Sequence, residues 1–434
     1  MSGEWKSLLL IGQGPGGTFY QAFDVTEAGM GGPLPESDDY ASVLATFTDP
    51  ARVRFLWAFP DYASFDTNLT TSGTTNAFSV SDATPGGKIR LYGDLKATAN
   101  AVEKSVGFTW SDPAVGTLTP DRSINVAIVG SGYFPSLEEV LVNRKTDAVR
   151  AGRSFYLIDL STGRVLRDPS TCGGSAACFD VGDLANPAWK NGLQADPTAG
   201  GATGDYVVTK AYLGDLDGRY WRFNFNQTGA ITATPLISTG QPIYNSSALL
   251  MVGTTEQYVF FSTGSDTLPR VAAAGGDAGP YKLYGIRDYG TTATVNFAYS
   301  LEWPGGSGRN RTAMMERPSA SPSVAGDIVF FTTTVEDTAA YCLSSSVRGR
   351  LYAFTYQGGA AYDTDNNGSL TKTDTAAVQT VSGRATAPFI VDQHLYFATS
   401  GPNGPSLEVF GNPEDFNNGV GQVGVRILSW RELR

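Results

Sequence analysis

The sequence predicts an all-β protein, and within that class a β-propeller of about seven four-stranded blades with loop and short helical insertions. Two observations support this prediction. The 51 Gly and 23 Pro residues stand beside only 17% charged residues, which favours short strands and tight turns over long surface helices. In addition, two strand signatures recur along the chain. Because 41% of the residues are hydrophobic, the chain can bury a core, and we treat residues 1–434 as a single domain.

The first strand signature is an apolar run that ends in small residues. It occurs at residues 8–12, 126–130, 258–262, 328–332 and 394–398. The second signature is an aromatic strand that leads into a turn, and it occurs at residues 19–24, 155–159, 220–224, 283–287 and 351–355. The aromatic residues Tyr156, Trp221, Tyr284 and Tyr352 are spaced 65, 63 and 68 residues apart. Four strands with long loops fill such an interval, and the radial packing of blades protects their edges.

Two further stretches complete the predicted architecture. The interval from Tyr20 to Tyr156 is wide enough for one more blade plus insertions, and residues 136–144 carry apolar residues near helical spacing, which predicts a short inserted helix. Residues 425–429 look like a last copy of the aromatic strand. A pair of β-sandwiches is the alternative arrangement for this many short strands, but the repeat favours the propeller.

Charge and composition exclude several classes of function. The 31 Lys+Arg and 42 Asp+Glu residues give a net charge of −11, whereas nucleic-acid binding requires a basic surface. His394 is the single histidine, which argues against a histidine-based catalytic triad or a multi-histidine metal site. No apolar run approaches the roughly 18 residues that a membrane-spanning helix needs, so no membrane span is predicted.

The first residues and the cysteines indicate an exported domain. The chain enters a strand almost at once, without the basic and apolar regions of a signal peptide, so we expect a domain cut from a longer secreted protein. Cys172 and Cys178 enclose five small, flexible residues, and a loop-stapling disulfide explains this spacing better than a thiol–metal site does. Cys342 is then left unpaired, as a buried rather than a reactive thiol.

The clearest local motif, at residues 363–374, predicts a calcium site. It fits the pattern of calcium-binding loops, with Gly368 at the sharp bend and Asp rather than Glu at the last position. Oxygens at alternating positions of such a loop converge on one side of a tight turn, where a hard dication binds. The predicted ligands are Asp363, Asp365, Asn367, Ser369, Thr371 and Asp374. The alternative is an Asx-rich hairpin turn, because the same residue types favour turns.

A second acidic pair, Asp215 and Asp217, lies in the segment Gly-Asp-Leu-Asp-Gly. If the strand continued through this segment, both carboxylates would point to one face, as a catalytic pair would. Turn chemistry is the better interpretation, because nothing in the sequence provides the two different environments that separate the pKa values of catalytic carboxylates. We therefore predict no catalytic residues.

Several segments resemble the C-terminal propeller of the PilY family, the tip-associated adhesins of bacterial type IV pili. Residues 12–26 are similar to the family's glycine-rich turn and following strand, and residues 129–133 with 156–163 are similar to its next blade. Residues 212–223, Tyr-Leu-Gly-Asp-Leu-Asp-Gly-Arg-Tyr-Trp-Arg-Phe, are the most specific match. Residues 262–266 and 428–432 complete a resemblance that covers nearly the whole chain in order.

The resemblance implies a calcium loop directly before the Gly-Asp-Leu strand, at residues 201–209. Only Asp205 keeps a carboxylate there, while Gly201, Thr203 and Thr209 stand where carboxylates are expected. Because a hard dication needs several anionic oxygens, this position is predicted to bind calcium weakly or not at all. The loop at residues 363–374 then either takes over this role or is purely structural.

The function implied by the resemblance is that of a type IV pilus-associated surface protein in pilus biogenesis, retraction control and adhesion, modulated by calcium. Its implied partners are pilus subunits (major or minor pilins) and a host or abiotic surface ligand. Its implied location is extracellular or at the cell surface, at the pilus tip or outer membrane. Residues 27–150 and 267–280 are the predicted contact loops.

The protein is predicted not to be an enzyme. One alternative is a propeller-fold enzyme such as a quinoprotein-like dehydrogenase or a glycosidase, but the adjacent cysteines of quinone-binding propellers are absent, since five residues separate Cys172 from Cys178. Another alternative is a calcium-loop propeller of a different function, in which the calcium loop recurs over several blades. Here the motif occurs once.

Overall fold

The computed structural model describes the greater part of the chain, and its residues fall into two compact units. Unit 1 comprises Met1–Pro197, Gly204–Lys210 and Phe223–Ala233, and unit 2 comprises Thr198–Thr203, Ala211–Arg222 and Thr234–Arg434. The described residues are 6–14, 19–27, 53–59, 106–132, 152–167, 176–181, 192–201, 207–252, 256–264, 280–302, 314–337, 347–365, 369, 375–391, 394–401, 404–410 and 426–427.

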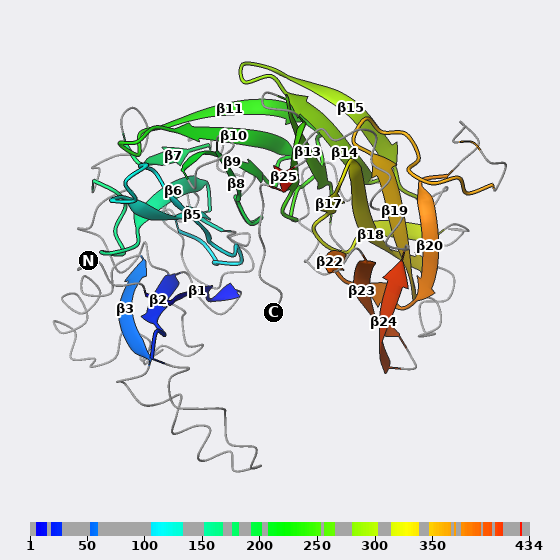
Figure 1. Ribbon diagram of the computed structural model, residues 1–434, viewed down its shortest axis with the longest axis horizontal. Helices are drawn as coiled ribbons and strands as arrows, with labels where there is room; N and C mark the ends of the chain where they lie inside the picture. Colours follow the sequence, from blue (N-terminus) through cyan, green and yellow to red (C-terminus); the bar gives the residue numbers. More distant parts are fainter. Residues whose placement is uncertain are drawn as a thin grey trace, which may run out of the picture. The chain divides into compact units, whose positions relative to one another are not determined.

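The described residues form six sheets, and most of their strands are labelled in Figure 1. In unit 1, one sheet has the order β1-β2-β3 and the other β4-β5-β6-β7. Their strands are β1 (Leu8–Gly12), β2 (Tyr20–Asp24), β3 (Arg54–Phe59), β4 (Ala114–Thr117), β5 (Asn125–Gly130), β6 (Ser154–Asp159) and β7 (Cys178–Asp180). A sheet of order β11-β10-β9-β8 has residues in both units. Its strands are β8 (Thr198–Gly201), β9 (Val208–Gly214), β10 (Arg219–Phe225) and β11 (Ile231–Ser238).

Unit 2 contains the other three sheets. The first, of order β15-β14-β13-β12-β25, consists of β12 (Ala248–Val252), β13 (Glu256–Ser262), β14 (Lys282–Asp288), β15 (Ala293–Ser300) and β25 (Arg426–Ile427). The second consists of β16 (Met314–Pro318), β17 (Ser323–Ala325), β18 (Ile328–Asp337), β19 (Val347–Thr355) and β20 (Ala377–Ser382); β16 and β17 both pair with β18. In the third, β23 (His394–Gly401) pairs with β21 (Arg384–Ala385), β22 (Phe389–Val391) and β24 (Gly404–Phe410).

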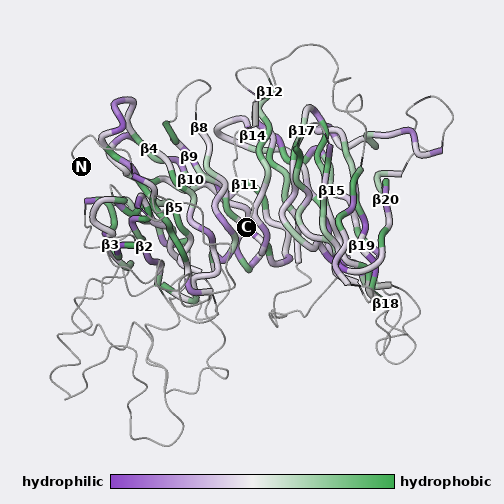
Figure 2. Tube along the Cα trace, turned by 60° about the horizontal axis from the view of Figure 1, so that its bottom comes forward, coloured by the Kyte–Doolittle hydropathy of each residue, from purple (hydrophilic) through white to green (hydrophobic). Residues whose placement is uncertain are grey.

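Two of the repeated apolar runs form strands that are buried on both faces, whereas the run at residues 8–12, in β1, is mostly half-buried. The runs at residues 126–130 and 258–262 lie in β5 and β13, where every residue after the first is buried. Figure 2 shows the hydrophobic residues concentrated in the strands, with hydrophilic residues at many of the turns. Burial of both faces removes the polar alternation of a half-exposed strand, which explains the continuous apolar runs.

Layers of aromatic side chains hold the sheets of unit 2 together. A stacked series runs from Tyr220 through Phe261 to Tyr284, with ring centroids 4.1 Å and 5.1 Å apart. It belongs to a buried cluster that also includes Val259 and Ile286. Such offset aromatic pairs add about 0.5–1.5 kcal/mol each beyond the area they bury.

A side-chain cap recurs at the turn that follows the aromatic strand of a sheet. In four sheets an Asp or Asn side chain accepts the backbone N–H two residues further on, which forms an Asx turn. The pairs are Asp24 with Thr26, Asp159 with Ser161, Asn226 with Thr228, and Asp288 with Gly290, at 2.7–3.1 Å. In a fifth sheet Thr355 Oγ1 accepts the N–H of Gly359 at 3.0 Å. The same kind of side-chain-to-backbone hydrogen bond thus recurs in five sheets, although the capping residue varies among Asp, Asn and Thr.

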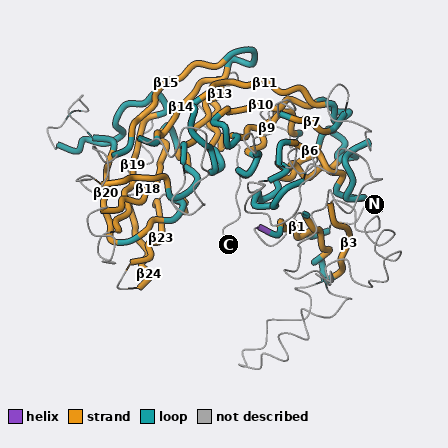
Figure 3. The backbone as a smooth tube through the Cα atoms, turned by 180° about the vertical axis from the view of Figure 1, so that it is seen from behind, coloured by secondary structure: helices purple, strands orange, loops and turns teal. Residues whose placement is uncertain are grey.

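Strands dominate the part of the chain that the structure describes (Figure 3). Six sheets lie among these residues, whereas about seven four-stranded blades were predicted from the sequence. The predicted helix at residues 136–144 lies outside the described residues. Within the described residues, no helix has both the length and the apolar character that crossing a membrane requires.

Candidate functional site

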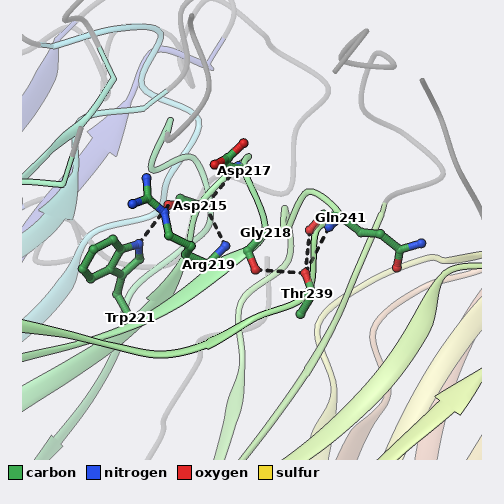
Figure 4. Close-up of polar contacts among 7 residues, drawn as sticks. All are labelled: Asp215, Asp217, Gly218, Arg219, Trp221, Thr239 and Gln241. Atoms are coloured by element: carbon green, nitrogen blue, oxygen red, sulfur yellow. Dashed lines mark hydrogen bonds and ion pairs between the residues drawn. The ribbon is translucent and has the colours of Figure 1, made fainter. Parts of the chain in front are cut away.

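The Gly-Asp-Leu-Asp-Gly segment forms the tight turn between β9 and β10, and the Asp215 carboxylate is its centre (Figure 4). Asp215 is completely buried. Its Oδ1 accepts the backbone N–H groups of Asp217 and Arg219 at 3.0 and 2.8 Å, and its Oδ2 accepts Arg219 Nε–H and Trp221 Nε1–H at 3.1 and 2.9 Å. Four donors therefore point at the two oxygens, an arrangement that an ionised carboxylate satisfies.

The environment of Asp215 has two opposing effects on its pKa. Burial raises the pKa above its usual range, while the hydrogen bonds from Trp221 and Arg219 and the charge of Arg219 act to lower it. The Arg219 guanidinium also lies 5.1 Å from the Trp221 ring, so the three side chains form one packed group. With all four donors engaged, the carboxylate is arranged to hold the turn rather than to exchange protons with a substrate.

A second layer of contacts joins this turn to the adjacent polypeptide. Gly218 has φ +86°, and a Cβ at this position would lie 2.5 Å from the backbone oxygen of Gln241. The Gly218 carbonyl accepts both the N–H and the hydroxyl of Thr239, at 2.8 and 2.9 Å. The Gln241 side chain then accepts the Thr263 hydroxyl and donates to the Pro280 carbonyl, each at 2.8 Å. The turn is therefore part of a hydrogen-bonded framework that reaches the next sheet.

Two further acidic side chains are buried in unit 2, and the sequence did not single them out. Asp288 accepts hydrogen bonds from Tyr212, Arg222 and the Gly290 N–H. Burial acts to raise the pKa of Asp288, but the bonds from Tyr212 and Arg222 outweigh it and the pKa lies below its usual range. Its position at the end of an aromatic strand, in the recurring Asx turn, is the signal that identifies it.

Glu316, on β16, is the second of these acids. It is fully buried, and its carboxylate accepts bonds from the Thr333, Tyr352 and Arg350 side chains and the Glu302 backbone N–H, at 2.5–3.1 Å. Both Asp288 and Glu316 have partners for both oxygens, so each ties strands together.

The structure describes the predicted calcium loop only in part. Asp363 is half-buried, Asp365 and Ser369 are exposed, and Asn367, Thr371 and Asp374 lie outside the described residues. Thr364 Oγ1 accepts the Thr375 N–H at 2.8 Å, so the two ends of the loop are held together. Among the described residues there is no group of three or more acidic, histidine or cysteine side chains placed to hold a metal ion.

The other sequence predictions are divided between strands and residues that the structure does not describe. Gly201 and Thr209 lie in β8 and β9, and Thr203 and Asp205 lie outside the described residues. Cys178 is disulfide-bonded. Cys172 and Cys342 lie outside the described residues, so the Cys172–Cys178 pairing stays a prediction. Most residues of the predicted contact loops at 27–150 and 267–280 likewise lie outside the described residues. In the last predicted strand, at residues 425–429, the structure describes Arg426 and Ile427, which pair with β12.

No family model and no curated protein matches the sequence. Among solved structures, the chain is similar to the C-terminal domain of Pseudomonas aeruginosa PilY1, with 16% identity, coverage of 95% of this chain and 82% of that chain, and a TM-score of 0.52. Two solved structures are more distant. BamB from Moraxella catarrhalis has 11% identity, coverage of 69% of this chain and 85% of that chain, and a TM-score of 0.28. Oligopeptidase B from Leishmania major has 11% identity, coverage of 96% of this chain and 39% of that chain, and a TM-score of 0.35.

The likeness to the PilY1 C-terminal domain shows the fold. The chain is all-β, and its fold is the β-propeller of that domain. The fold class predicted from the sequence is confirmed, and the resemblance to the PilY family is confirmed as a PilY1-like fold.

Proposed function

We propose that this chain is the propeller of a type IV pilus-associated surface protein, which acts in pilus biogenesis, retraction control and adhesion. One observation carries the proposal: a PilY1-like fold extends over 95% of the chain, and the most PilY-like segment of the sequence forms its best-defined turn. Its partners would be pilus subunits and a surface ligand, and its location the cell surface. A rigid sheet framework that carries long loops suits a binding platform.

The proposal includes a binding role without catalysis. The acidic pair that most resembles catalytic machinery has one member, Asp215, that is buried and engaged by four donors. A general acid or base needs a carboxylate within reach of a substrate proton. Asp215 lacks that access, which supports a structural role for this turn.

Calcium at residues 363–374 is the second part of the proposal. The described residues fit a loop of this kind: Asp363 and Asp365 supply carboxylates, Ser369 a hydroxyl, and the Thr364–Thr375 hydrogen bond closes the loop. Bound calcium would add charge neutralisation and rigidity to the loop. At residues 201–209, Gly201 and Thr209 supply no carboxylate and lie in β-strands, so the calcium proposal rests on residues 363–374 alone.

A genetic experiment tests the pilus role. Residues 1–434 are deleted in frame in the bacterium that encodes them, and surface pilin, twitching motility and attachment to an abiotic surface are measured. We expect fewer surface pili and weaker attachment, restored by the wild-type gene. Unchanged piliation, twitching and attachment would contradict the proposal.

Calorimetry tests the calcium part separately. The metal-stripped protein is titrated with calcium beside a variant that combines Asp363→Ala and Asp365→Ala, and beside Asp121→Ala, a control acid in an exposed turn outside the loop. We expect one binding event that the double variant loses and Asp121→Ala retains. Calcium binding that survives the double substitution would exclude this loop as the site.

A further inference from the structure

Two neighbouring sheets of unit 2 present tyrosine at the same position of the recurring turn that follows the aromatic strand. The residue directly after the capping side chain is Val25, Leu160, Gln227, Tyr289 or Tyr356 in the five sheets. Tyr289 keeps 50% of its surface exposed, whereas Leu160 at the equivalent position is buried. The turn repeats from sheet to sheet, but among these five positions only Tyr289 is a largely exposed aromatic ring, because Tyr356 packs against the core.

The turn that carries Tyr289 is held rigidly. Its N–H donates to the Thr292 carbonyl at 2.9 Å, and the Gly290 N–H donates to Asp288 Oδ1 at 2.8 Å. Asp288 is in turn buried and bound by Arg222 and Tyr212. A tyrosine on such a turn offers a large contact area and loses little conformational entropy when a ligand binds.

Polar groups surround the exposed ring and extend it into a row across the two sheets. The Arg287 guanidinium lies 4.7 Å from the Tyr289 ring and 5.8 Å from the Tyr258 ring. Arg287 also pairs with Glu256 at 2.5 Å, and Glu256 accepts the Tyr258 hydroxyl at 3.1 Å. We refer to Tyr289, Arg287, Glu256, Tyr258, Tyr356 and Gln357 as the tyrosine row.

The far end of the tyrosine row lies on the neighbouring sheet. The Tyr258 ring meets the Tyr356 ring edge to face at 4.9 Å, and the Gln357 amide donates to the Tyr356 hydroxyl at 3.1 Å. Burial raises the pKa of Tyr258 to about 12, with a further rise from the neighbouring Glu256, so its hydroxyl remains a donor at neutral pH. These contacts fix the orientations of the row before any ligand arrives.

We propose that the tyrosine row is a carbohydrate-binding surface, and that it supplies the ligand contact in the adhesive part of the proposed function, on which this inference rests. The face of an aromatic ring is negative and attracts the slightly positive C–H groups on one face of a sugar ring. Guanidinium, carboxylate and amide groups beside it match sugar hydroxyls as donors and acceptors.

Charge and exposure favour an uncharged glycan over an anionic ligand or a protein. Arg287 and Glu256 neutralise each other, and their side chains remain 30% and 37% exposed. The partially exposed polar atoms are therefore available to hydroxyl groups without leaving an unpaired charge. A protein hot spot is typically a well-packed, fully desolvated pocket, whereas Tyr289, Arg287 and Glu256 are partly exposed and polar groups lie beside the ring. Tyr258 is buried and supports this exposed end of the row from the core.

Binding to an array of neutral and sialylated oligosaccharides tests the proposal with the purified chain. Tyr289→Ala removes the ring, Tyr289→Trp keeps an aromatic face, and Gln227→Ala is a matched control at the same turn position of another sheet. We expect the wild type, Tyr289→Trp and Gln227→Ala to bind neutral glycans, and Tyr289→Ala to lose at least tenfold in affinity with an unchanged melting temperature.

Several results would overturn the proposal. They are no binding to any oligosaccharide by the wild type, equal binding by Tyr289→Ala, or a preference for sialylated glycans alone. Loss of binding to purified pilin, rather than to glycans, in Tyr289→Ala would assign the row to a protein partner instead. If the deletion strain loses pili and attachment but the purified chain binds no oligosaccharide, this inference is rejected and the pilus role stands. If the deletion strain is unchanged but the chain binds neutral glycans through Tyr289, the pilus role is rejected and glycan binding stands.

Discussion

Asp24 and Asp215 show how one local device serves two different environments. Each carboxylate accepts the backbone N–H two residues further along the chain, at 3.1 and 3.0 Å. Asp24 ends the central strand of the β1-β2-β3 sheet in unit 1 and keeps 11% of its side-chain surface exposed, with Lys6 at 2.9 Å and the largely exposed Arg54 at 3.6 Å. Asp215 has no exposed surface, and its side-chain partners are Arg219 and Trp221.

The two environments shift the two pKa values in opposite directions. Hydrogen bonds from Thr26 and Lys6 hold the pKa of Asp24 below its usual range, whereas burial raises that of Asp215. The turn motif alone therefore does not predict the direction in which the pKa of its aspartate is shifted. The degree of burial and the exposure of the partners decide whether the carboxylate pairs with partly exposed cations, as Asp24 does, or is a fully buried anchor whose loss leaves several donors without a partner, as Asp215 is.

Among the variants considered, replacement of Asp215 by Asn is expected to cause the largest loss in the free energy of unfolding. Asn can still accept the two backbone N–H groups at Oδ1, but its NH₂ group would face the N–H donors of Arg219 and Trp221. We expect Asp215→Asn to lower the free energy of unfolding by about 3–5 kcal/mol, because the Trp221 and Arg219 donors would each lose their acceptor, at about 1–3 kcal/mol per unsatisfied group. Urea unfolding followed by tryptophan fluorescence measures this loss.

Asp24→Asn, measured in the same way, is the comparison for Asp215→Asn. Equal losses at the two positions would show that the shared turn geometry, and not burial, sets the energy.

A substitution at Gly218 is expected to cause the next largest loss of stability, because the Asp215 turn leaves no space for a side chain at this position. Gly218→Ala would place its Cβ 2.5 Å from the Gln241 backbone oxygen at a φ of +86°. We expect a loss of about 2–3 kcal/mol from strain and displacement. Gly240→Ala is the matched control, since Gly240 also has positive φ (+68°) but no atom lies within 4 Å of its Cβ.

The control variant is expected to lose only about 1 kcal/mol, the cost of the left-handed conformation alone. Differential scanning calorimetry of the two variants gives the difference. If Gly240→Ala were as destabilising as Gly218→Ala, the close contact with Gln241 would contribute nothing.

The strands were predictable from the sequence because their signals are local. The apolar runs at residues 8–12 and 258–262 lie in β1 and β13, and the aromatic run at 351–355 forms the end of β19. The Asp215 turn was also accessible from the sequence, since its partners Arg219 and Trp221 lie four and six residues away. Contacts at this range are encoded in a single short motif.

The buried Glu316 group was not predictable for the opposite reason. Its partners Glu302, Thr333 and Arg350 lie 14, 17 and 34 residues away. The pairing of β16 with β18, and of β18 with β19, brings Thr333 and Arg350 to Glu316. The same holds for the tyrosine row, whose members come from two sheets. The equivalence of Tyr289 and Tyr356 becomes visible only when the turns are aligned by their hydrogen bonds.

Asp24→Asn gives the smallest effect, and its pH dependence distinguishes the two acids. Because the folded pKa of Asp24 is depressed, its contribution is present above the ordinary Asp pKa of about 4 and is lost as the pH falls through the folded value. We expect the variant to be about 1 kcal/mol less stable than wild type above about pH 5, a difference that shrinks below about pH 4. For Asp215 the sign is opposite: with a raised folded pKa, protonation favours the folded state as the pH falls from neutral. Unfolding free energies measured from pH 3 to 7 would contradict this contrast if the difference between wild type and Asp24→Asn grew, rather than shrank, at low pH.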